Sequence, residues 1–112
     1  MPTVKLVLEY DGTSYAGWQR QPAQLTIQEA IEQAIQQVSQ TTVSVIGAGR
    51  TDSGVHARGQ VASFRTELDW PASSWMRALN AVLPKDIAVR SSSLMDDRFH
   101  AQHDARGKLY TY

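Results

Sequence analysis

Cysteine is absent from the 112 residues of this chain, which excludes disulfide bonds and thiolate zinc sites. No apolar run approaches the roughly 20 residues that a membrane-spanning helix needs. The start of the chain also lacks the basic and apolar segments of a secretory signal peptide. Eleven basic and eleven acidic residues give a formal net charge of zero, so the overall charge does not point to a nucleic acid. The length suits one domain with a modest core.

The charges that are present are distributed unevenly along the chain. The first 49 residues carry two basic and four acidic side chains, whereas residues 50–112 carry nine basic and seven acidic ones. Seven of those nine are arginine, whose planar guanidinium suits phosphates and base edges better than lysine does. The same distribution is also typical of an ordinary solvated surface, so charge alone leaves both interpretations open.

The periodicity of apolar residues predicts four strands and two helices. Alternation predicts a strand over 3–10, and Thr26 and Glu29 form the T-x-x-E capping box that begins a helix. Strands are further predicted over 41–49, 59–66 and 86–94, and a second helix from Ser73 or Ser74 up to Pro84. The order β-α-β-β-α-β predicts an α+β, ferredoxin-like fold, in which an antiparallel sheet carries both helices on one face.

The last residues, 106–112, alternate in the manner of a fifth strand that stops as it begins. A strand cut short leaves an unpaired edge, which folded proteins usually avoid. We therefore expect residues 1–105 to form the ferredoxin-like domain. Residues 106–112 are expected to be the first strand of a second domain, so that the chain is the front portion of a longer protein.

The stretch GAGRTDSGVHARGQ, residues 47–60, is the strongest candidate for a functional site. If the chain is still extended there, Arg50 and Asp52 project to the same side, and the guanidinium holds the carboxylate ionised. Gly54 then allows a turn. These residues fit a lone catalytic aspartate and a structural Arg–Asp pair equally well. A dinucleotide-binding loop is disfavoured, because its third glycine would stand where Asp52 is and a helix would have to follow.

A metal site is a weaker interpretation of the same region. Asp52 and His56 are close in sequence, and His100, His103 and Asp104 offer further imidazole and carboxylate ligands. The last three lie in an irregular tract where nothing fixes the direction of their side chains. We expect no bound metal.

The loop over residues 11–24 combines aromatic, arginine and glutamine side chains. Such side chains stack on and hydrogen-bond to unpaired RNA bases. The candidates for these contacts are Tyr15, Trp18, Gln19, Arg20 and Gln21. The alternative for Trp18 is that its indole folds back over the core. Tyr110 and Tyr112 are similarly open to a packing role or a stacking role.

Four segments together closely resemble the TruA family of tRNA pseudouridine synthases. They are residues 9–21, 47–64, 79–89 and, with unmatched positions, 99–112. The resemblance covers essentially the whole chain, and the R-T-D-x-G-V-H-A pattern is highly specific. It implies isomerisation of uridine to pseudouridine at positions 38 to 40 in the anticodon arm of tRNA. It further implies a cytoplasmic homodimer that needs no cofactor and binds tRNA rather than DNA or a membrane.

The resemblance also assigns roles to individual residues. Asp52 matches the catalytic aspartate, which acts as nucleophile or base, and Arg50 matches the partner that pairs with it and helps displace the target base. Tyr110 matches the tyrosine that packs against the uracil. The chain departs from the family pattern at Gln102 and Asp104. The remaining expected substrate-binding residues are Trp18, Gln19, Arg20 and His56, the last of which also braces the turn.

Family members carry a second domain that closes the catalytic cleft, so we expect these 112 residues alone to be inactive. Two alternatives to this enzyme share the predicted fold. One is a non-catalytic RNA-binding module, although the strand over 59–66 offers only Phe64 as a stacking aromatic. The other is a small metal-dependent or acyl-phosphate hydrolase.

Overall fold

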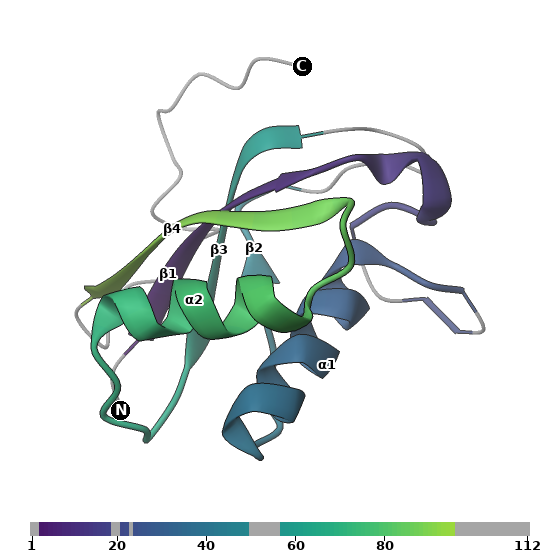
Figure 1. The fold of residues 1–112 in the computed structure, drawn as a ribbon. Helices are drawn as coiled ribbons and strands as arrows, with labels where there is room; N and C mark the ends of the chain where they lie inside the picture. Colours follow the sequence, from purple (N-terminus) through teal and green to yellow (C-terminus); the bar gives the residue numbers. More distant parts are fainter. Residues whose placement is uncertain (1–2, 19–20, 23, 50–56, 96–112) are drawn as a thin grey trace.

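A computed structural model describes residues 3–18, 21–22, 24–49 and 57–95 of the chain. Within these residues, four strands form one antiparallel sheet in the order β2-β3-β1-β4 (Figure 1). Two helices and a 3₁₀ turn complete the fold. The elements are β1 (Thr3–Tyr10), η1 (Gly12–Ser14), α1 (Ile27–Ser39), β2 (Ile46–Gly47), β3 (Ala57–Arg65), α2 (Ala72–Val82) and β4 (Ile87–Met95). This confirms the predicted β-α-β-β-α-β order and the ferredoxin-like α+β fold.

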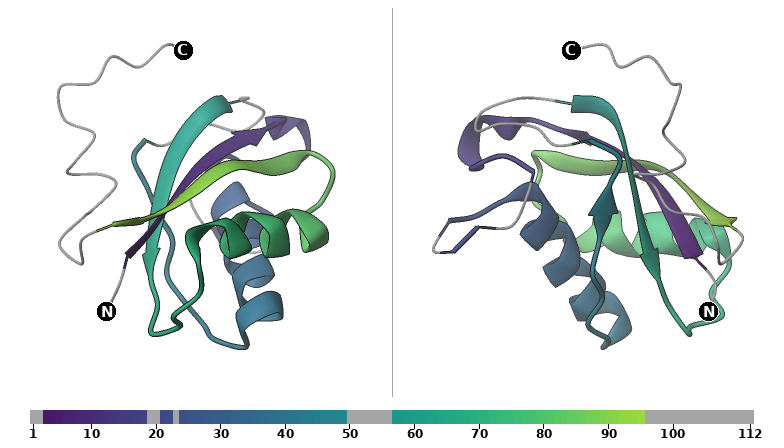
Figure 2. Two further views of the ribbon diagram at one scale, coloured as in Figure 1. Left: turned by 60° about the vertical axis from the view of Figure 1, so that its left-hand side comes forward. Right: turned by 180° about the vertical axis from the view of Figure 1, so that it is seen from behind.

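Both helices cover the same face of the sheet, as all three ribbon views show (Figures 1 and 2). The core lies between the two layers, because every second residue of β1 points toward the helices. The fully covered side chains at its centre include Leu6, Leu8, Ile31, Phe64 and Trp75. The opposite face of the sheet carries the remaining residues of each strand, among them Lys5, Val7 and Glu9.

Helix α1 begins and ends as its sequence dictates. The hydroxyl of Thr26 accepts a hydrogen bond from the backbone N–H of Glu29 at 3.3 Å, which confirms the predicted N-cap. Its apolar stripe at three- and four-residue spacing faces the sheet and is buried. The helix ends at Ser39, and the C-cap residue Gln40 adopts a left-handed conformation with φ 61°.

Helix α2 begins earlier than predicted. Its first residue is Ala72 rather than one of the two following serines, and Pro71 occupies the N-cap position without a side-chain hydrogen bond. The backbone carbonyl of Pro71 accepts a hydrogen bond from the N–H of Ser74 at 3.0 Å, so this N–H is satisfied without a serine side chain at the cap. The helix ends at Val82 because Leu83, which precedes Pro84, is extended.

Strand β2 is much shorter than the predicted strand over 41–49. Only Ile46 and Gly47 pair with β3. Just before them, the backbone of Val45 is bound by side chains of α1 instead of by a neighbouring strand. This competition explains why good strand formers do not extend the ladder. Strands β3 and β4 differ from prediction only by one or two residues at their ends. The expected second-domain strand over 106–112 lies outside the described residues.

Across the described ranges, no helix is long and apolar enough to cross a membrane.

Candidate active site

The sequence places the candidate site on residues 50–56, which join β2 to β3. Most of the predicted site residues lie outside the part of the chain that the structure describes: Gln19, Arg20, Arg50, Asp52, His56 and Tyr110. The structure does describe both flanks of the 50–56 segment, up to Gly49 on one side and from Ala57 on the other. It also describes Trp18. The arrangement of the flanks therefore defines how the fold presents the site.

The flank before the segment is held to β3 by three contacts. Gly47 stands opposite Ala62 in the β2–β3 ladder, and the N–H of Ala48 donates to the carbonyl of Val61 at 2.8 Å. The side-chain amide of Gln60 then donates to the carbonyl of Gly49. Gln60 is 9% exposed and lies on the helix-covered side of β3, where apolar side chains are the rule. The chain is thus tied to the sheet up to the residue before Arg50.

Helix α1 fixes the same flank one step earlier. The side-chain amide of Gln28 donates to the carbonyl of Val45 at 2.9 Å, and the carboxylate of Glu32 accepts from the N–H of Val45 at 2.9 Å. The two residues lie four apart on one helix face and together bind both backbone polar groups of Val45. Both residues lie away from the apolar stripe of α1, a position typical of solvent-facing side chains. No local sequence pattern indicates that a charged helix residue will accept a hydrogen bond from a distant backbone N–H.

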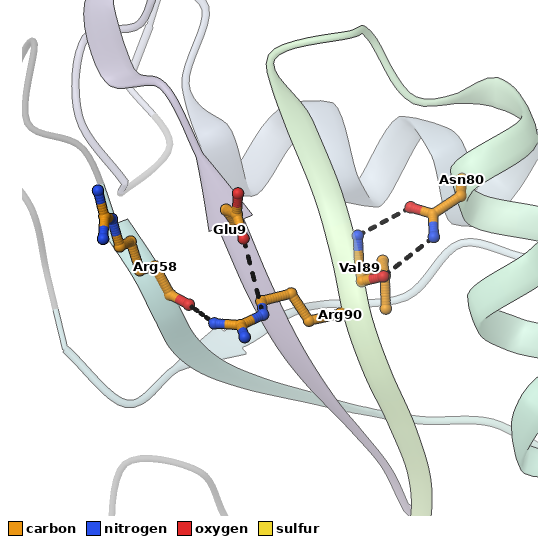
Figure 3. Close-up of polar contacts among 5 residues, drawn as sticks. All are labelled: Glu9, Arg58, Asn80, Val89 and Arg90. Carbon is orange, nitrogen blue, oxygen red and sulfur yellow. Dashed lines mark hydrogen bonds and ion pairs between the residues drawn. The ribbon is translucent and has the colours of Figure 1, made fainter.

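The flank after the segment is held at the start of β3. Ala57 stands opposite Tyr10, and the guanidinium of Arg90 donates to the carbonyl of Arg58 from two strands away (Figure 3). The same guanidinium lies 3.6 Å from the carboxylate of Glu9, on the strand between. A β-bulge between Val7 and Leu8 leaves Arg90 without an opposite residue on β1. The contact therefore links β4 to β3 across β1.

Trp18 lies in the core and not on the surface. Its side chain is 3% exposed, and its ring centroid is 6.3 Å from that of Tyr10. Stacking on an RNA base requires an open ring face, which a side chain covered to this extent does not offer. The burial favours the packing alternative for this residue.

The backbone around Trp18 is bound to the start of α1. The N–H groups of Ile27 and Gln28 donate to the carbonyls of Gly17 and Trp18, at 3.1 Å and 3.0 Å. These donors have no partner within the helix, so the loop satisfies them. Gly17 has a φ of 97°, a conformation that favours glycine. The loop over residues 11–18 is therefore fixed relative to α1.

Tyr15 belongs to the same loop and is also buried, with 4% of its surface exposed. Its hydroxyl donates to the carboxylate of Asp86 at 2.7 Å, and the N–H of Asp11 donates to the carbonyl of Asp86 at 2.9 Å. Burial, followed by the hydrogen bond and charge of Asp86, raises the pKa of Tyr15 above its usual value. Tyr15 fixes the loop against the turn that precedes β4.

Within the described ranges, no three or more histidine, aspartate or glutamate side chains lie together so that they could hold a metal ion. The candidate metal ligands of the sequence, from Asp52 to Asp104, all lie outside those ranges.

Comparison with known proteins adds what the geometry alone leaves open. The sequence profile of a family described as tRNA pseudouridine synthase matches residues 6–104. The chain belongs to this family. The match begins within β1 and includes all the later described elements and the 50–56 segment between β2 and β3.

Individual relatives align with the whole chain. A protein of Geobacter sulfurreducens named tRNA pseudouridine synthase A is 50% identical over 112 residues, which are 100% of this chain and 46% of that protein. A protein of Syntrophotalea carbinolica with the same name is 48% identical, over 100% of this chain and 44% of its own length. In Clostridium perfringens, a protein named tRNA pseudouridine synthase A 2 is 47% identical, over 100% of this chain and 46% of its own. The chain thus spans about half the length of these relatives.

Proposed function

We propose that this chain carries the catalytic part of an enzyme that isomerises uridine to pseudouridine in tRNA, at positions 38 to 40 of the anticodon arm. Family membership and the names of the relatives support this reaction. The structural observation behind the proposal is that the chain is held in place on both sides of residues 50–56. Contacts from α1 and β3 hold the chain before the segment, and the β1 pairing and Arg90 hold the chain after it. A catalytic carboxylate must be held in a defined position, and this requires that the backbone on both sides of its segment is fixed.

Asp52 is the proposed catalytic residue, acting as nucleophile or base, and Arg50 is its ion-pair partner. In the reaction, the bond from C1′ of the ribose to N1 of uracil breaks and a bond from C1′ to C5 forms. The proton on C5 is lost to solvent and N1 takes one up, so neither an oxidant nor water is consumed. One ionised carboxylate beside the sugar and the ring is enough for this sequence. The protein is proposed to need no cofactor or metal.

Access to the uridine requires that the nucleotide leave the helical stack, at a cost of a few kcal/mol. Arg50 is proposed to fill part of the vacated space, and Tyr110 to cage the freed uracil. Gln19, Arg20 and His56 are proposed to contact the RNA around the target. Trp18, as a buried residue, is left out of this contact set.

The remaining expectations concern the assembly. Residues 1–105 are proposed to form the ferredoxin-like domain, and residues 106–112 to start a second domain that closes the cleft. The complete enzyme is proposed to be a cytoplasmic homodimer that binds tRNA and neither DNA nor a membrane. Without the second domain, the 112 residues are expected to fold and to have little activity, since phosphate contacts dominate RNA affinity and this chain has no net charge.

The test uses a chimera in which residues 1–112 replace the aligned segment of the Geobacter sulfurreducens relative. Tritium release from tRNA that carries 5-³H-uridine is measured for the chimera, for its Asp52→Asn variant and for the isolated chain. We expect release by the chimera, none by Asp52→Asn with tRNA binding retained, and little or none by the isolated chain.

Each alternative result has a definite meaning. Equal release by the chimera and by Asp52→Asn would remove Asp52 from the chemistry. Binding of tRNA without release by the chimera, while the unmodified relative is active, would favour a non-catalytic RNA-binding module. Tritium release that depends on added metal and is abolished by EDTA on prefolded tRNA would contradict the proposed metal-free reaction.

A further inference from the structure

The indole of Trp18 occupies the space directly beside Gly47. A Cβ atom placed on Gly47 would lie 2.6 Å from both Cε2 and Nε1 of Trp18, and 2.8 Å from Cζ2. Carbon atoms that are not bonded prefer separations of about 3.5 to 4.0 Å, so no side chain fits at this position without displacing the ring or the strand. The backbone of Gly47 therefore rests against the ring face or edge of a buried tryptophan.

The ring itself has little freedom to move. Trp18 is 3% exposed and packs near Tyr10, and its own carbonyl is bound by the N–H of Gln28 at the start of α1. The preceding residue, Gly17, is bound in the same way by Ile27. A close-packed side chain on a fixed backbone cannot shift easily to make room for added atoms, because protein interiors tolerate little change in volume.

Trp18 also contacts one flank of the candidate site and a residue that is paired with the other flank. It contacts Gly47, two residues before the end of the first flank, and it lies beside Tyr10, whose backbone is opposite Ala57 at the start of the second flank. Through these contacts, the buried ring of Trp18 connects the last residue of β2 with Tyr10, the partner of the first residue of β3. Asp52 follows Gly47 by five residues in the sequence.

We propose that Trp18 is a positioning residue for the isomerisation: its indole, packed against the side-chain-free Gly47, sets the line along which the chain leaves β2 toward Arg50 and Asp52. This inference rests on the function proposed above and gives Trp18 a role without contact to the substrate. Glycine at position 47 is then required for the close approach of the ring and not for an unusual backbone conformation. A misplacement of about 1 Å costs on the order of 100-fold in rate when a catalytic group depends on it.

The experiment compares four variants of the chimera defined above: Gly47→Ala, Trp18→Phe, the Gly47→Ala/Trp18→Phe double variant and Gly59→Ala. Gly59 is the matched control, because a Cβ atom placed on it would meet nothing within 4 Å. For each variant, kcat and KM for tRNA are measured by tritium release, and Tm by thermal unfolding. The native chimera must release tritium before any variant is interpreted, so a failure of the proposed function is recognised separately.

We expect Gly47→Ala to lower kcat by about 10- to 100-fold with KM within about twofold, as for a group that acts only in the transition state. Gly59→Ala should keep the native kcat. The smaller ring of Trp18→Phe makes room for the added methyl, so the double variant should recover most of the kcat of Trp18→Phe alone. A general loss of stability would instead add up in the double variant, because both single changes disturb the same core.

Three outcomes would overturn the proposal. They are a Gly47→Ala variant with native kcat, a double variant no more active than Gly47→Ala, and an equal loss of kcat in Gly59→Ala. If Gly47→Ala does not fold, Trp18→Phe and Trp18→Leu carry the test. A graded fall in kcat at constant KM supports the positioning role, and native kcat in both variants refutes it.

Discussion

The hydroxyl of Tyr15 donates a 2.7 Å hydrogen bond to the carboxylate of Asp86, which lies 71 residues further along the chain. The bond joins the loop after β1 to the turn before β4, and a backbone bond from Asp11 to Asp86 runs beside it. Because the same loop presents Trp18 to β2, this pair contributes to the support of the candidate site from a distance. A buried phenol that donates to a carboxylate also has a recognisable pH signature.

Replacing Tyr15 with phenylalanine tests that signature. Hydrogen bonds to charged groups contribute about 1.5 to 3 kcal/mol, and Asp86 is partly solvated, so we expect Tyr15→Phe to lower the free energy of unfolding by about 1 to 2 kcal/mol at pH 7. The raised pKa of Tyr15 means that the folded state keeps the proton at a pH where the unfolded chain loses it. The stabilisation is therefore complete below the unfolded pKa of about 10 and is lost as the pH rises above it.

Urea unfolding between pH 7 and pH 11 measures both effects. The native chain should lose stability with rising pH more steeply than Tyr15→Phe does above pH 10. Parallel curves for the two proteins would mean that Tyr15 has the same proton affinity in both states. Asp86→Asn serves as a control, because it keeps an acceptor for the phenol but removes the charge.

Asn80 protects the outer edge of β4. Its amide donates to the carbonyl of Val89 at 3.0 Å, while its side-chain oxygen accepts from the N–H of the same residue at 2.8 Å (Figure 3). Among the strands that the structure describes, β4 lies at the edge of the sheet, so these backbone groups would otherwise be open to another strand. The asparagine completes the ladder with a side chain.

The variant Asn80→Asp keeps the acceptor and replaces the donor with a negative oxygen that faces the Val89 carbonyl. We expect it to cost about 1 to 3 kcal/mol at pH 7. Protonation restores a donor, so the introduced carboxyl has a raised pKa in the folded state, and its deficit relative to the native chain should shrink as the pH falls toward 3. Asn80→Ala, which loses both bonds, should show a deficit that does not change with pH. The free energy of unfolding at several pH values distinguishes the two variants.

The features that local sequence predicts well are those with a local cause. The capping box at Thr26 and the apolar spacing after it fix the start and the buried face of α1, and the alternation over residues 3–10 fixes β1 at its observed bounds. Strand β2 is the counterexample. Its residues favour a strand, but Gln28 and Glu32 of α1 bind the backbone of Val45, and this competition is visible only once the fold is formed.

The same distinction applies to the site. The R-T-D motif points to Asp52 as the proposed catalytic residue, because the resemblance to the family lies in the motif itself. The supports of that segment are spread over β1, α1, β3 and β4, and no short pattern connects Trp18 with Gly47 or Arg90 with Arg58. Burial decided between the two interpretations of Trp18, since an amphipathic aromatic in a loop suits either role.

The left-handed residue at the end of α1 predicts a stabilising substitution. Gln40 has a φ of 61°, where a residue with a Cβ atom is about 1 to 2 kcal/mol less favourable than glycine. Glycine also increases the entropy of the unfolded chain, which offsets part of the gain. We expect Gln40→Gly to raise the free energy of unfolding by about 0.5 to 1 kcal/mol. Gln40→Ala, which keeps the Cβ atom, should give no such increase in the same denaturant titration.

Replacing Gln60 should affect catalysis by a route that does not involve Trp18. Its buried side-chain amide donates to the carbonyl of Gly49, the last described residue before Arg50. The isosteric change Gln60→Glu removes the donor and sets a carboxylate against that carbonyl, so the chain should move away from β3 at this point. A loss of about 1 kcal/mol in the positioning of Asp52 corresponds to a roughly fivefold lower kcat. Tritium release by the chimera measures this value, with Gln28→Glu as a matched change at the α1 contact to Val45. If Gln60→Glu leaves kcat unchanged while Tm falls, the bond to Gly49 supports the fold alone.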